Sequence, residues 1–305
     1  MLFIPVLAKA KAVGCATTLT SNPVQFQSSI QYDDMQSKAN PTVHILVNGR
    51  PAKMMLDTGS NSHSLWDEFL LDENPSATIE RQHAIVGSGN ARKVKATLAD
   101  YHGNAIRQDF YLLTESALSE DGYSGILSPQ AIAGPNAVVV DFEENCFFTS
   151  PPFDIGTVND LNIRRGTTIP NPYYVIATSV ELDNRMIPML VDSGAPFTFI
   201  QASLLASKPK GKESPKIMDI FKAELPRNEH MRLVDLKING QILKSLPVIP
   251  RHTKNEEVVD NLGYIGMDIL KNNIIYYDGT HHDFNLLSRQ GTAQRLHNEN
   301  EIRAD

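Results

Sequence analysis

The sequence is short of cysteine, short of positive charge and without a long apolar run, and each shortage excludes a class of protein. Two cysteines among 305 residues, Cys15 and Cys146, cannot form a disulfide framework and match no zinc-binding spacing. Lysine and arginine number 28 against 35 acidic residues, which gives a net charge of −7 and disfavours binding to a phosphate backbone. No nucleic-acid partner is therefore expected. No apolar stretch approaches the ~20 residues of a transmembrane helix, so no membrane helix is expected either.

The composition is that of a globular protein with more than one domain. Hydrophobic residues make up 41% of the chain and charged residues 21%, so the chain can bury a core and is not disordered throughout. At roughly 100–200 residues per domain, the length of 305 residues predicts about two domains. The boundaries have to be sought in the pattern of the chain.

The first 41 residues are expected to form a leader or tether outside the folded lobes. Met1 to Leu7 is apolar, but Lys9 and Lys11 interrupt the run. The tetrapeptide Ala12-Val13-Gly14-Cys15 resembles the cleavage box of bacterial lipoproteins, which would make Cys15 a lipidation site and place the protein in the cell envelope or periplasm. Two alternatives stay open, a start inside a longer signal and a frayed terminus. From Thr20 to Pro41 the residues are mostly polar, which is typical of a loosely packed lead-in.

Short strand-like runs bounded by turn residues dominate the rest of the chain, so the fold class is expected to be mostly β. Residues 43–47 form one such run, Asn48-Gly49 is a strong two-residue hairpin signal, and residues 52–56 complete the hairpin. Helical patterns are few and short, near residues 202–206 and around Leu270. A second array repeats the strand-turn-strand pattern with residues 175–182, Asp183-Asn184 and residues 186–191.

The two arrays belong to an internal repeat. The second turn residue of each hairpin lies eight positions before an aspartate, Asp57 in the first array and Asp192 in the second. A small residue that ends an apolar pair follows each aspartate, Ser128 after 71 residues and Gly266 after 74. So long a period indicates duplicated domains rather than a solenoid. The predicted division is a leader over residues 1–41, an N-terminal lobe over 42–149, a proline- and glycine-rich linker over 150–172, a C-terminal lobe over 173–288 and a polar tail over 289–305.

Each half presents its aspartate on a tight turn after an apolar strand, in Leu56-Asp57-Thr58-Gly59-Ser60 and in Val191-Asp192-Ser193-Gly194-Ala195. With the Asn48-Gly49-Arg50 turn and the late segment Ile265-Gly266-Met267-Asp268-Ile269-Leu270, the chain resembles a two-lobed aspartic protease whose lobes are similar to retroviral and bacterial retropepsin-like subunits. A single Asp-Thr-Gly is a weak signal, whereas two such motifs in register are a strong one. The resemblance covers about residues 42–287 and implies a bilobal acid-protease fold, with two β-barrel-like lobes and the active site between them.

Two facing carboxyl groups explain how such a site would work. If Asp57 and Asp192 face each other, both cannot ionise, and the pair holds one proton over a wide pH range; the aspartic-protease dyad is the standard example of this effect. One carboxylate then takes a proton from a bound water, while the other, protonated, polarises the scissile carbonyl. The resemblance thus implies an aspartic endopeptidase with a polypeptide substrate and with no metal or other cofactor. Because both carboxyls lie on one chain, a catalytic monomer is expected; the carrier of the proton is left open.

The residues that follow each aspartate are expected to support it. The resemblance implies that the hydroxyls of Thr58 and Ser193 form hydrogen bonds across the interface between the lobes. Gly59 and Gly194 would let the backbone turn with dihedral angles that a β-carbon opposes. Both loops are therefore expected to be tight and linked to each other.

The two halves also differ near the expected site. The resemblance implies that Ser60 holds the outer oxygen of the first aspartate, whereas Ala195 has no hydroxyl to do the same for the second. The two carboxyls are therefore expected to be inequivalent. Ser128 stands where the second half has Gly266, and it would be strained if that position needs a positive φ.

Val86-Gly87-Ser88-Gly89-Asn90 is interpreted as the tip of a flap hairpin that would pair with an extended substrate as an added strand. An ordinary surface turn is the alternative. The matching stretch of the second half, Lys216 to Pro226, contains no glycine, so a single flap is expected. Trp66 is expected behind the first aspartate loop.

Two other interpretations stand beside the protease. His281-His282-Asp283 suggests a metal site, but neighbouring residues of a strand point to opposite faces, so a solvated turn is favoured. The alternative function is a catalytically silent peptide-binding or assembly module that kept the fold but lost turnover. Ala195, Ser128 and the absence of a second flap favour this alternative.

Overall fold

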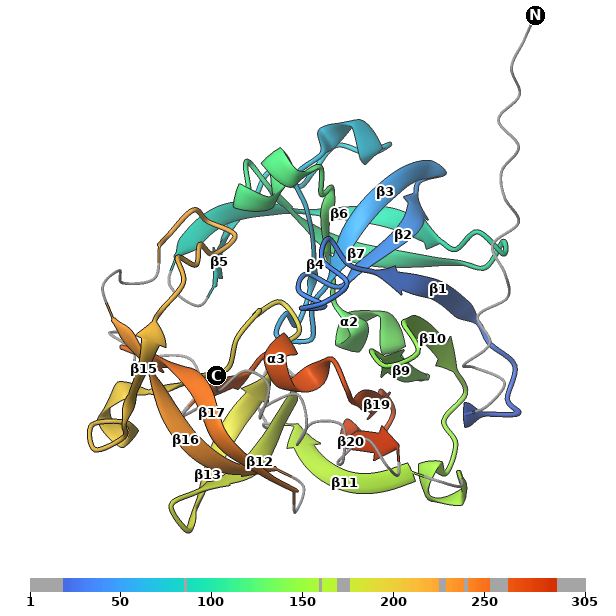
Figure 1. Ribbon diagram of the computed structural model, residues 1–305. Coiled ribbons are helices and arrows are strands. Elements are labelled where there is room, and N and C mark those ends of the chain that lie inside the picture. The colour runs from blue at the N-terminus through green and yellow to red at the C-terminus, as the bar shows by residue number, and fades with distance from the viewer. Residues whose placement is uncertain are drawn as a thin grey trace, which may run out of the picture.

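The computed structural model describes residues 19–84, 87–158, 161–168, 176–224, 229–238, 241–252 and 263–289 (Figure 1). Strands account for 51% of these residues and helices for 10%, which confirms the mostly β class. The strands form two closed six-stranded barrels, one from each half of the chain, and a further sheet that joins them. In Figure 1 the N-terminal barrel is blue to green and the C-terminal barrel yellow to orange.

The N-terminal barrel consists of β2 (Thr42–Val47), β3 (Arg50–Leu56), β4 (His63–Leu65), β6 (Ser88–Ala99), β7 (Ala105–Leu113) and β8 (Gly125–Leu127). It closes in the order β2-β3-β8-β4-β7-β6, and β6 pairs back onto β2. The β2–β3 hairpin turns at Asn48 and Gly49, whose φ angles are 49° and 76°. This left-handed backbone is the conformation that an Asn-Gly turn favours, so the hairpin forms where the sequence predicts it.

The C-terminal barrel consists of β12 (Ile176–Leu182), β13 (Arg185–Val191), β14 (Phe199–Gln201), β16 (His230–Ile238), β17 (Gln241–Arg251) and β18 (Gly263–Ile265). It closes in the same order, β12-β13-β18-β14-β17-β16, and β16 pairs back onto β12. Its first hairpin turns at Asp183 and Asn184, with φ angles of 53° and 61°. The two halves therefore share strand order and strand direction, as an internal repeat requires.

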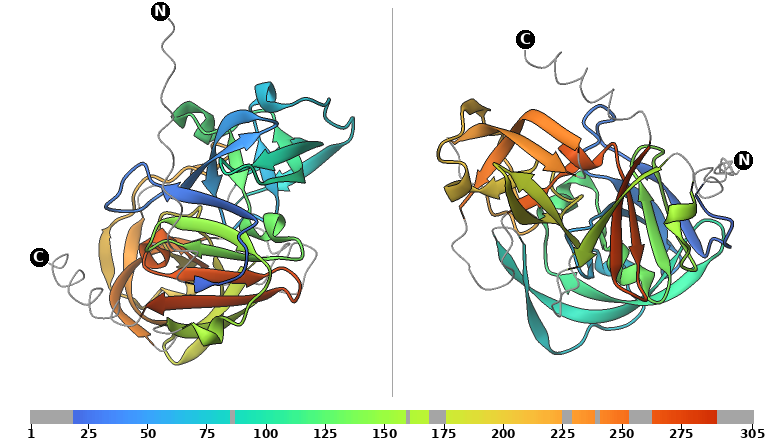
Figure 2. Two further views of the ribbon diagram at one scale, coloured as in Figure 1. Left: turned by 90° about the vertical axis from the view of Figure 1, so that its right-hand side faces the viewer. Right: turned by 90° about the horizontal axis from the view of Figure 1, so that it is seen from below.

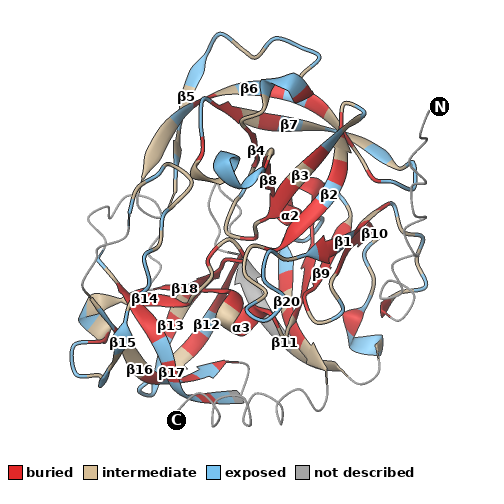
Figure 3. Cartoon of the chain, turned by 45° about the horizontal axis from the view of Figure 1, so that its top comes forward, coloured by how far each residue is buried: buried red, intermediate tan, exposed pale blue. Residues whose placement is uncertain are grey.

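Alternating burial along the strands places a core inside each barrel. In β2 the side chains of Val43, Ile45 and Val47 are buried, whereas His44 between them is exposed. Successive residues of a strand point to opposite faces, so this pattern turns one face of β2 into the barrel. Figure 3 shows the buried residues concentrated on the barrel strands and on the sheet between the barrels.

Six antiparallel strands join the barrels in the order β1-β10-β9-β19-β20-β11, three from each half. Alternate residues of β9 face two different apolar clusters, Val138 and Val140 one of them and Val139 the other. A sheet covered on both faces is apolar throughout, which explains the unbroken valine run of β9. Figure 2 shows the green strands of the first half beside the red strands of the second half in this sheet. The bounds are β1 (Phe26–Gln31), β9 (Ala137–Asp141), β10 (Cys146–Ser150), β11 (Leu161–Thr168), β19 (Ile274–Asp278) and β20 (Asp283–Arg289).

Two strands of this joining sheet lie where the sequence predicts none. β1 falls inside the expected leader, residues 1–41, and β11 inside the expected linker, residues 150–172. β20 also reaches Arg289, the first residue of the expected tail. Each half therefore begins one strand earlier than predicted. The sequence pattern did not reveal these strands because polar strands gain their stability from pairing in the sheet rather than from an apolar pattern. The lipidation site predicted at Cys15 lies outside the described residues.

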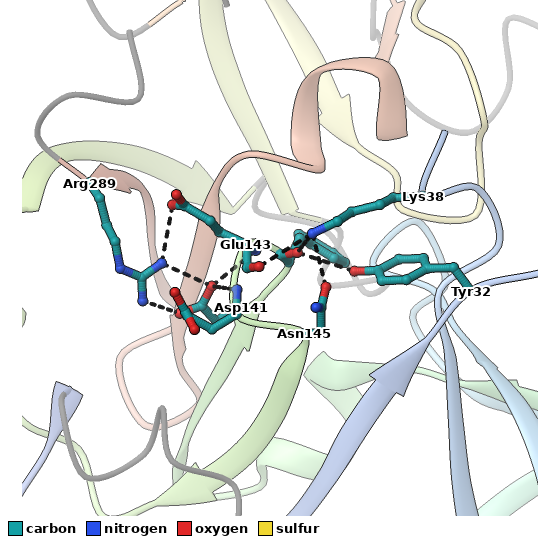
Figure 4. Close-up of polar contacts among 8 residues, drawn as sticks. Tyr32, Lys38, Asp141, Glu143, Asn145 and Arg289 are labelled. Carbon is teal, nitrogen blue, oxygen red and sulfur yellow. Dashed lines mark hydrogen bonds and ion pairs between the residues drawn. The ribbon is translucent and has the colours of Figure 1, made fainter. Parts of the chain in front are cut away.

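An ion-pair cluster fixes the end of β20 against the joining sheet (Figure 4). Arg289 donates hydrogen bonds to the two carboxylate oxygens of Asp141 at 2.5 and 3.2 Å, and to Glu143 at 3.2 Å. Asp141 is fully buried at the end of β9, so the guanidinium is the charge partner that makes its burial tolerable. The cluster links the last described strand of the second half to the last residue of β9 and to the turn that follows it.

The segment that follows β1 is attached to the turn between β9 and β10. Lys38 donates through Nζ to the side-chain oxygen of Asn145 at 2.9 Å and to the carbonyl of Phe142. The hydroxyl of Tyr32 donates to the same carbonyl at 3.3 Å (Figure 4). Residues 32–38 therefore contact the body of the protein, which corrects the expectation of a loosely packed lead-in.

Short elements complete the described chain. None of the described helices is long and apolar enough to cross a membrane. The helical patterns expected near residues 202–206 and Leu270 appear as single turns, η4 and α3. The short elements are β5 (Ile79–His83), β15 (Lys210–Glu213), α2 (Pro129–Ala133), α3 (Met267–Leu270), η1 (Glu68–Leu70), η2 (Ala117–Asp121), η3 (Ile155–Thr157) and η4 (Ala202–Leu204).

Candidate active site

Two equivalent loops meet at the interface between the barrels, and each follows a buried strand. Asp57 follows β3, and its amide donates to the carbonyl of Leu127 in β8 at 3.0 Å. Asp192 follows β13, and its amide donates to the carbonyl of Ile265 in β18 at 3.0 Å. The same parallel strand pairing thus holds both aspartates, and each loop stands on apolar, buried strands that fix its position.

Four hydrogen bonds connect the two loops. The hydroxyl of Thr58 donates to the carbonyl of Val191 at 2.8 Å and accepts from the amide of Ser193 at 2.9 Å. The hydroxyl of Ser193 donates to the carbonyl of Leu56 at 2.7 Å and accepts from the amide of Thr58 at 3.0 Å. Thr58 and Ser193 are both fully buried, so each bond is made away from water. The hydrogen bonds expected across the interface are present, and serine serves as well as threonine because only the hydroxyl is used.

Gly59 and Gly194 are needed for close approach rather than for their backbone angles. A β-carbon on Gly59 would lie 2.5 Å from Oδ1 of Asp192, and one on Gly194 would lie 2.8 Å from the carboxyl carbon of Asp57. Neither glycine is among the described residues with a positive φ. The expectation that these glycines relieve a strained backbone is therefore wrong, because each one makes room for the opposite carboxyl.

The carboxyl groups of Asp57 and Asp192 are hydrogen-bonded to each other. Asp192 is buried, with 5% of its surface exposed, whereas Asp57 is half-buried. Burial raises the pKa of Asp57, and backbone amides and the hydrogen bond from Asp192 oppose this rise. Burial also raises the pKa of Asp192, and the negative charge of Asp57 raises it further. The pair therefore favours one shared proton, held by the more deeply buried Asp192.

Backbone amides of the loops surround the two carboxyls. Amide donors stabilise an ionised carboxylate, so those around Asp57 favour its charged form. The donors are Gly59 at 2.8 Å, Gly194 and Ser60 for Asp57, and Gly194 at 2.9 Å and Ala195 at 3.2 Å for Asp192.

The side chain of Ser60 does not hold the first aspartate. Its hydroxyl donates to the carbonyl of Ser62 at 2.8 Å, and only its backbone amide lowers the pKa of Asp57. Ala195 contributes a backbone amide at the equivalent place of the second loop. The serine hydroxyl therefore does not make the two carboxyls inequivalent. They differ instead in their surroundings: hydrogen bonds lower the pKa of Asp57, whereas the charge of Asp57 raises the pKa of Asp192.

Side chains beneath the first loop fix its carbonyl groups. Ser128 has a φ of −87°, so the strain expected there is absent. Its hydroxyl donates to the carbonyl of Ser60 at 2.6 Å, and its amide donates to Nδ1 of His63 at 3.1 Å. The amide group of Gln130 donates to the carbonyl of Thr58 at 2.6 Å. These bonds hold the loop in the shape that presents Asp57.

The second loop has an equivalent support made of different residues. Thr198 Oγ1 accepts from the amide of Gly266 at 3.2 Å, as His63 Nδ1 accepts from the equivalent serine in the first half. The same hydroxyl donates to Asp268 at 2.8 Å, and burial raises the pKa of this carboxyl to about 6. Neither His63 nor Thr198 was among the predicted site residues, although each lies six residues after its aspartate and the repeat register aligns them.

His63 is a fully buried histidine. Its ring lies 5.0 Å from that of Phe110, and its Nε2 has no hydrogen-bond partner within the described part of the chain. Burial lowers the pKa of His63 to about 3, because the charged imidazolium would lose its hydration. The imidazole is therefore neutral at physiological pH.

The segment expected to form a flap is a hairpin of the N-terminal barrel. β5 pairs with β6 in the register His83 to Ser88, and the amide of Ala84 donates to the carbonyl of Gly87 at 2.9 Å. Ser88 accepts a hydrogen bond from Arg81 on the facing strand. Val86, at the expected tip, lies outside the described residues.

The glycines of this hairpin contact the C-terminal barrel. A β-carbon on Gly87 would lie 3.0 Å from Oδ2 of Asp219, and one on Gly89 would lie 2.4 Å from the ring of Phe221. The amide of Gly87 donates a hydrogen bond to the same carboxylate of Asp219. Both glycines thus allow close packing between the two halves.

The stretch of the second half that was expected to form no flap also forms a hairpin. Residues 218–224, which we name the crossing loop, form a hairpin closed by a bridge between Met218 and Glu224. Oδ1 of Asp219 accepts from the amides of Phe221 and Ala223, both at 2.9 Å, and Lys222 adopts a φ of 61°. A carboxylate cap and one left-handed lysine therefore form the turn without glycine.

Trp66 lies behind the first loop, as the sequence predicts. It packs against Met55 and Ile126, which belong to the two strands that carry the loop, and its ring nitrogen donates to the carbonyl of Tyr123. The fluorescence of Trp66 is therefore sensitive to changes in the region next to Asp57.

The two histidines of the His281-His282-Asp283 motif have separate partners. The Nδ1 of His281 lies 2.9 Å from Asp278, and the Nδ1 of His282 lies 2.8 Å from the hydroxyl of Tyr277. Hydrogen bonding to Asp278 raises the pKa of His281. The arrangement is that of a hydrogen-bonded turn between β19 and β20.

Comparison with known proteins assigns no family to the chain. No family model matches it, and a search of curated proteins finds no significant match. The residues of the site and their geometry are therefore the basis on which a function can be proposed.

Proposed function

We propose that the protein is an aspartic endopeptidase that hydrolyses peptide bonds with a water molecule activated between Asp57 and Asp192. The observation that supports this most strongly is the hydrogen bond between the two carboxyls at the meeting point of two equivalent loops. Structural ion pairs join opposite charges, whereas two acidic groups in contact keep one proton between them at neutral pH. Such a pair supplies a base and an acid side by side, as water addition to an amide carbonyl requires.

The unequal surroundings assign a role to each carboxyl. Asp57, in its ionised form, takes a proton from the attacking water, because backbone amides stabilise its charge. Asp192, which holds the shared proton, donates a hydrogen bond to the carbonyl oxygen of the scissile peptide. The proton that Asp57 gains then passes to the leaving amine, and the pair returns to its starting state with one proton. No covalent intermediate is formed on the protein.

The polypeptide substrate would lie extended beside the dyad, under the β5–β6 hairpin. Main-chain groups of Gly87, Ser88 and Gly89 would pair with the substrate backbone, as in strand addition to a sheet edge. Because both carboxyls come from one chain, the active species would be a monomer. Activity that falls on dilution of the purified protein would contradict this point.

A fluorogenic peptide library tests the proposed activity. Wild type, Asp57→Asn and Asp192→Asn are compared, with Asp109→Asn as the matched control because the side chain of Asp109 is 72% exposed. We expect cleavage by wild type and the control, and a loss of at least about 100-fold in both active-site variants, as for removal of a catalytic acid or base. Cleavage that survives either substitution would refute the dyad mechanism.

The alternative of a silent peptide-binding module makes the opposite prediction. Peptides would bind to wild type without being cut, and the asparagine variants would bind equally well. Two of the three features that favoured this alternative do not hold in the fold. Ser128 is not strained, and the second half does form a hairpin, the crossing loop. Ala195 is also neutral in this respect, because its backbone amide reaches Asp192.

A further inference from the structure

The crossing loop spans from the C-terminal barrel to the N-terminal barrel and binds there through its main chain and its charges. The amide of Ala117 donates to the carbonyl of Ile220 at 3.0 Å. Lys222 lies 3.2 Å from Glu115 and 4.0 Å from Glu120 of the same region. In Figure 1 the gold segment that follows β15 reaches the β5–β6 hairpin, in agreement with the contacts of Asp219 with Gly87 and of Phe221 with Gly89.

The side chain of Ile220 packs into an apolar cluster of the N-terminal barrel. The buried members of this cluster are Met55, Tyr123 and Ile126, and Trp66 is among the partly buried ones. Ile220 is the only described residue of the C-terminal barrel in the cluster, and it is itself half-buried. A residue from the other half of the chain therefore covers an apolar surface of the first.

This apolar cluster lies next to the first aspartate of the dyad. Met55 precedes Asp57 by two residues at the end of β3, and alternate residues of an extended chain share a face. Met55 is paired with Ile126 across the parallel strands β3 and β8, so both flank the loop that carries the carboxyl. A peptide bound at the dyad would place a side chain against this cluster.

We propose that the crossing loop holds the place of a substrate, with Ile220 in the position that an apolar side chain of the peptide takes next to the cleaved bond. The inference rests on the proposed function. Ile220 offers the cluster a branched aliphatic side chain, and its carbonyl accepts a main-chain hydrogen bond from Ala117 as a peptide carbonyl would. The site therefore selects peptides with isoleucine, valine or leucine at this position, and they bind only after the loop has left.

Because peptide binds only to molecules whose loop is displaced, the apparent affinity for peptide is the intrinsic affinity multiplied by the open fraction. A substitution that weakens the loop contact without touching the dyad therefore raises kcat/KM. Ile220→Ala removes the apolar contact, and Lys222→Glu turns two attractions into repulsions from Glu115 and Glu120. We expect each to raise kcat/KM for the fluorogenic library about fivefold, as the open fraction increases.

The matched controls make the same chemical changes elsewhere on the C-terminal barrel. Ile242→Ala replaces an isoleucine that is 57% exposed. Lys237→Glu reverses the charge of a lysine that pairs with Glu181 at 2.9 Å within the same barrel. Neither control is expected to change kcat/KM or the residue preference of the cleavage.

Opening of the loop is measured independently of activity through Trp66, the single tryptophan of the chain. Lys222→Glu leaves the tryptophan cluster itself unaltered, so an increase in acrylamide quenching of Trp66 reports movement of the loop. We expect this increase in Lys222→Glu and no increase in Lys237→Glu. High salt should reduce the quenching of Lys222→Glu, because it screens the repulsion.

The possible results separate this inference from the proposed function. Unchanged quenching in Lys222→Glu, or a kcat/KM that falls in Ile220→Ala, would overturn the inference while aspartate-dependent cleavage by wild type stands. Mass spectrometry of the products should find aliphatic residues enriched at one position beside the cut, and a charged residue preferred there would also overturn it. Increased quenching with no cleavage by any variant would refute the proposed function, and substrate mimicry with it.

Discussion

Replacing His63 by threonine should remove an acid-induced weakening of the N-terminal barrel. His63 is fully buried against Phe110, and burial lowers its pKa from 6.5 to about 3. In the unfolded chain the imidazole binds a proton below about pH 6.5, whereas in the folded barrel it remains neutral. The stability contributed by this neutral histidine is therefore present above pH 6.5 and is lost as the pH falls toward 3.

The structure also sets the size of the effect. A pKa of about 3 in the folded protein and 6.5 in the unfolded chain corresponds to about 4 kcal/mol of unfolding free energy lost between pH 7 and pH 3. Threonine occupies the equivalent place in the second barrel, where Thr198 accepts the amide of Gly266. His63→Thr thus offers an acceptor to Ser128 and carries no titratable group. The cavity beside Phe110 should cost about 1–3 kcal/mol at pH 7.

Urea unfolding at pH 7, 5.5 and 4, followed by the fluorescence of Trp66 in the same barrel, measures this effect. His63→Thr should be less stable than wild type at pH 7 and should equal or exceed it at pH 4. His102→Thr, which changes an exposed histidine between β6 and β7, is the control and should follow the wild-type profile. If the unfolding free energy of His63→Thr falls with pH in parallel with wild type, the buried neutral imidazole does not account for acid sensitivity.

Three further predictions concern the dyad loops and the joining sheet. Thr58→Val and Ser193→Ala, measured singly and together by urea unfolding at pH 7, should show a coupling energy of about 1–3 kcal/mol, because each hydroxyl accepts from and donates to the opposite loop. Additive effects would contradict the linkage, and Thr58→Ser should retain it. Asp192→Asn should be more stable than wild type at pH 7. The raised pKa of Asp192 keeps its proton bound in the folded state while the unfolded chain loses it above pH 3.8, so wild-type stability falls as the pH rises from 3.8 toward the folded pKa, and asparagine has no proton to lose. The gain should disappear below about pH 3, and an equal gain in acid would count against the shared proton. Arg289→Met should lower the unfolding free energy by about 2–4 kcal/mol because Asp141 stays buried without its partner. Arg92→Met, at an exposed pair 3.8 Å from Glu68, should cost less than about 1 kcal/mol, and equal losses would show that the buried pair has no special weight.

The sequence was sufficient to locate the repeat and the two aspartate loops. Asn48-Gly49 determines its turn locally, because few residues adopt the positive φ angles that the turn needs. The spacing from each hairpin to its aspartate then fixes where the strand ends. Local signals of this kind do not depend on the rest of the fold, so they can be interpreted from one sequence.

The joining sheet could not be predicted from local pattern. β1 and β11 are polar strands, and their stability comes from pairing with distant strands rather than from their own side chains. The repeat register nevertheless contains the missing signal: Phe26 and Leu161, the first residues of these strands, lie 135 residues apart, as do Asp57 and Asp192. Extending the alignment of the halves upstream would have found both strands.

The second hairpin shows a limit of another kind. The absence of glycine between Lys216 and Pro226 suggested that no flap-like turn forms there, yet Asp219 caps the turn and Lys222 takes the left-handed conformation. Composition states which residues make a turn easy and does not exclude the others. The close approach of Gly59 to the opposite aspartate is likewise a tertiary contact that the sequence alone does not define.

The chemistry proposed here depends on differences between two halves that share one main-chain frame. Two carboxyls in identical surroundings would share a proton equally, and neither would be reserved as base or acid. The deeper burial of Asp192 and the amides around Asp57 break this balance, although the loops differ little in sequence. The crossing loop adds a second asymmetry, since it comes from the C-terminal barrel and covers the cluster beside Asp57. Under the proposed function, a peptide would therefore approach Asp57, the base, at a surface that the crossing loop of the C-terminal half covers.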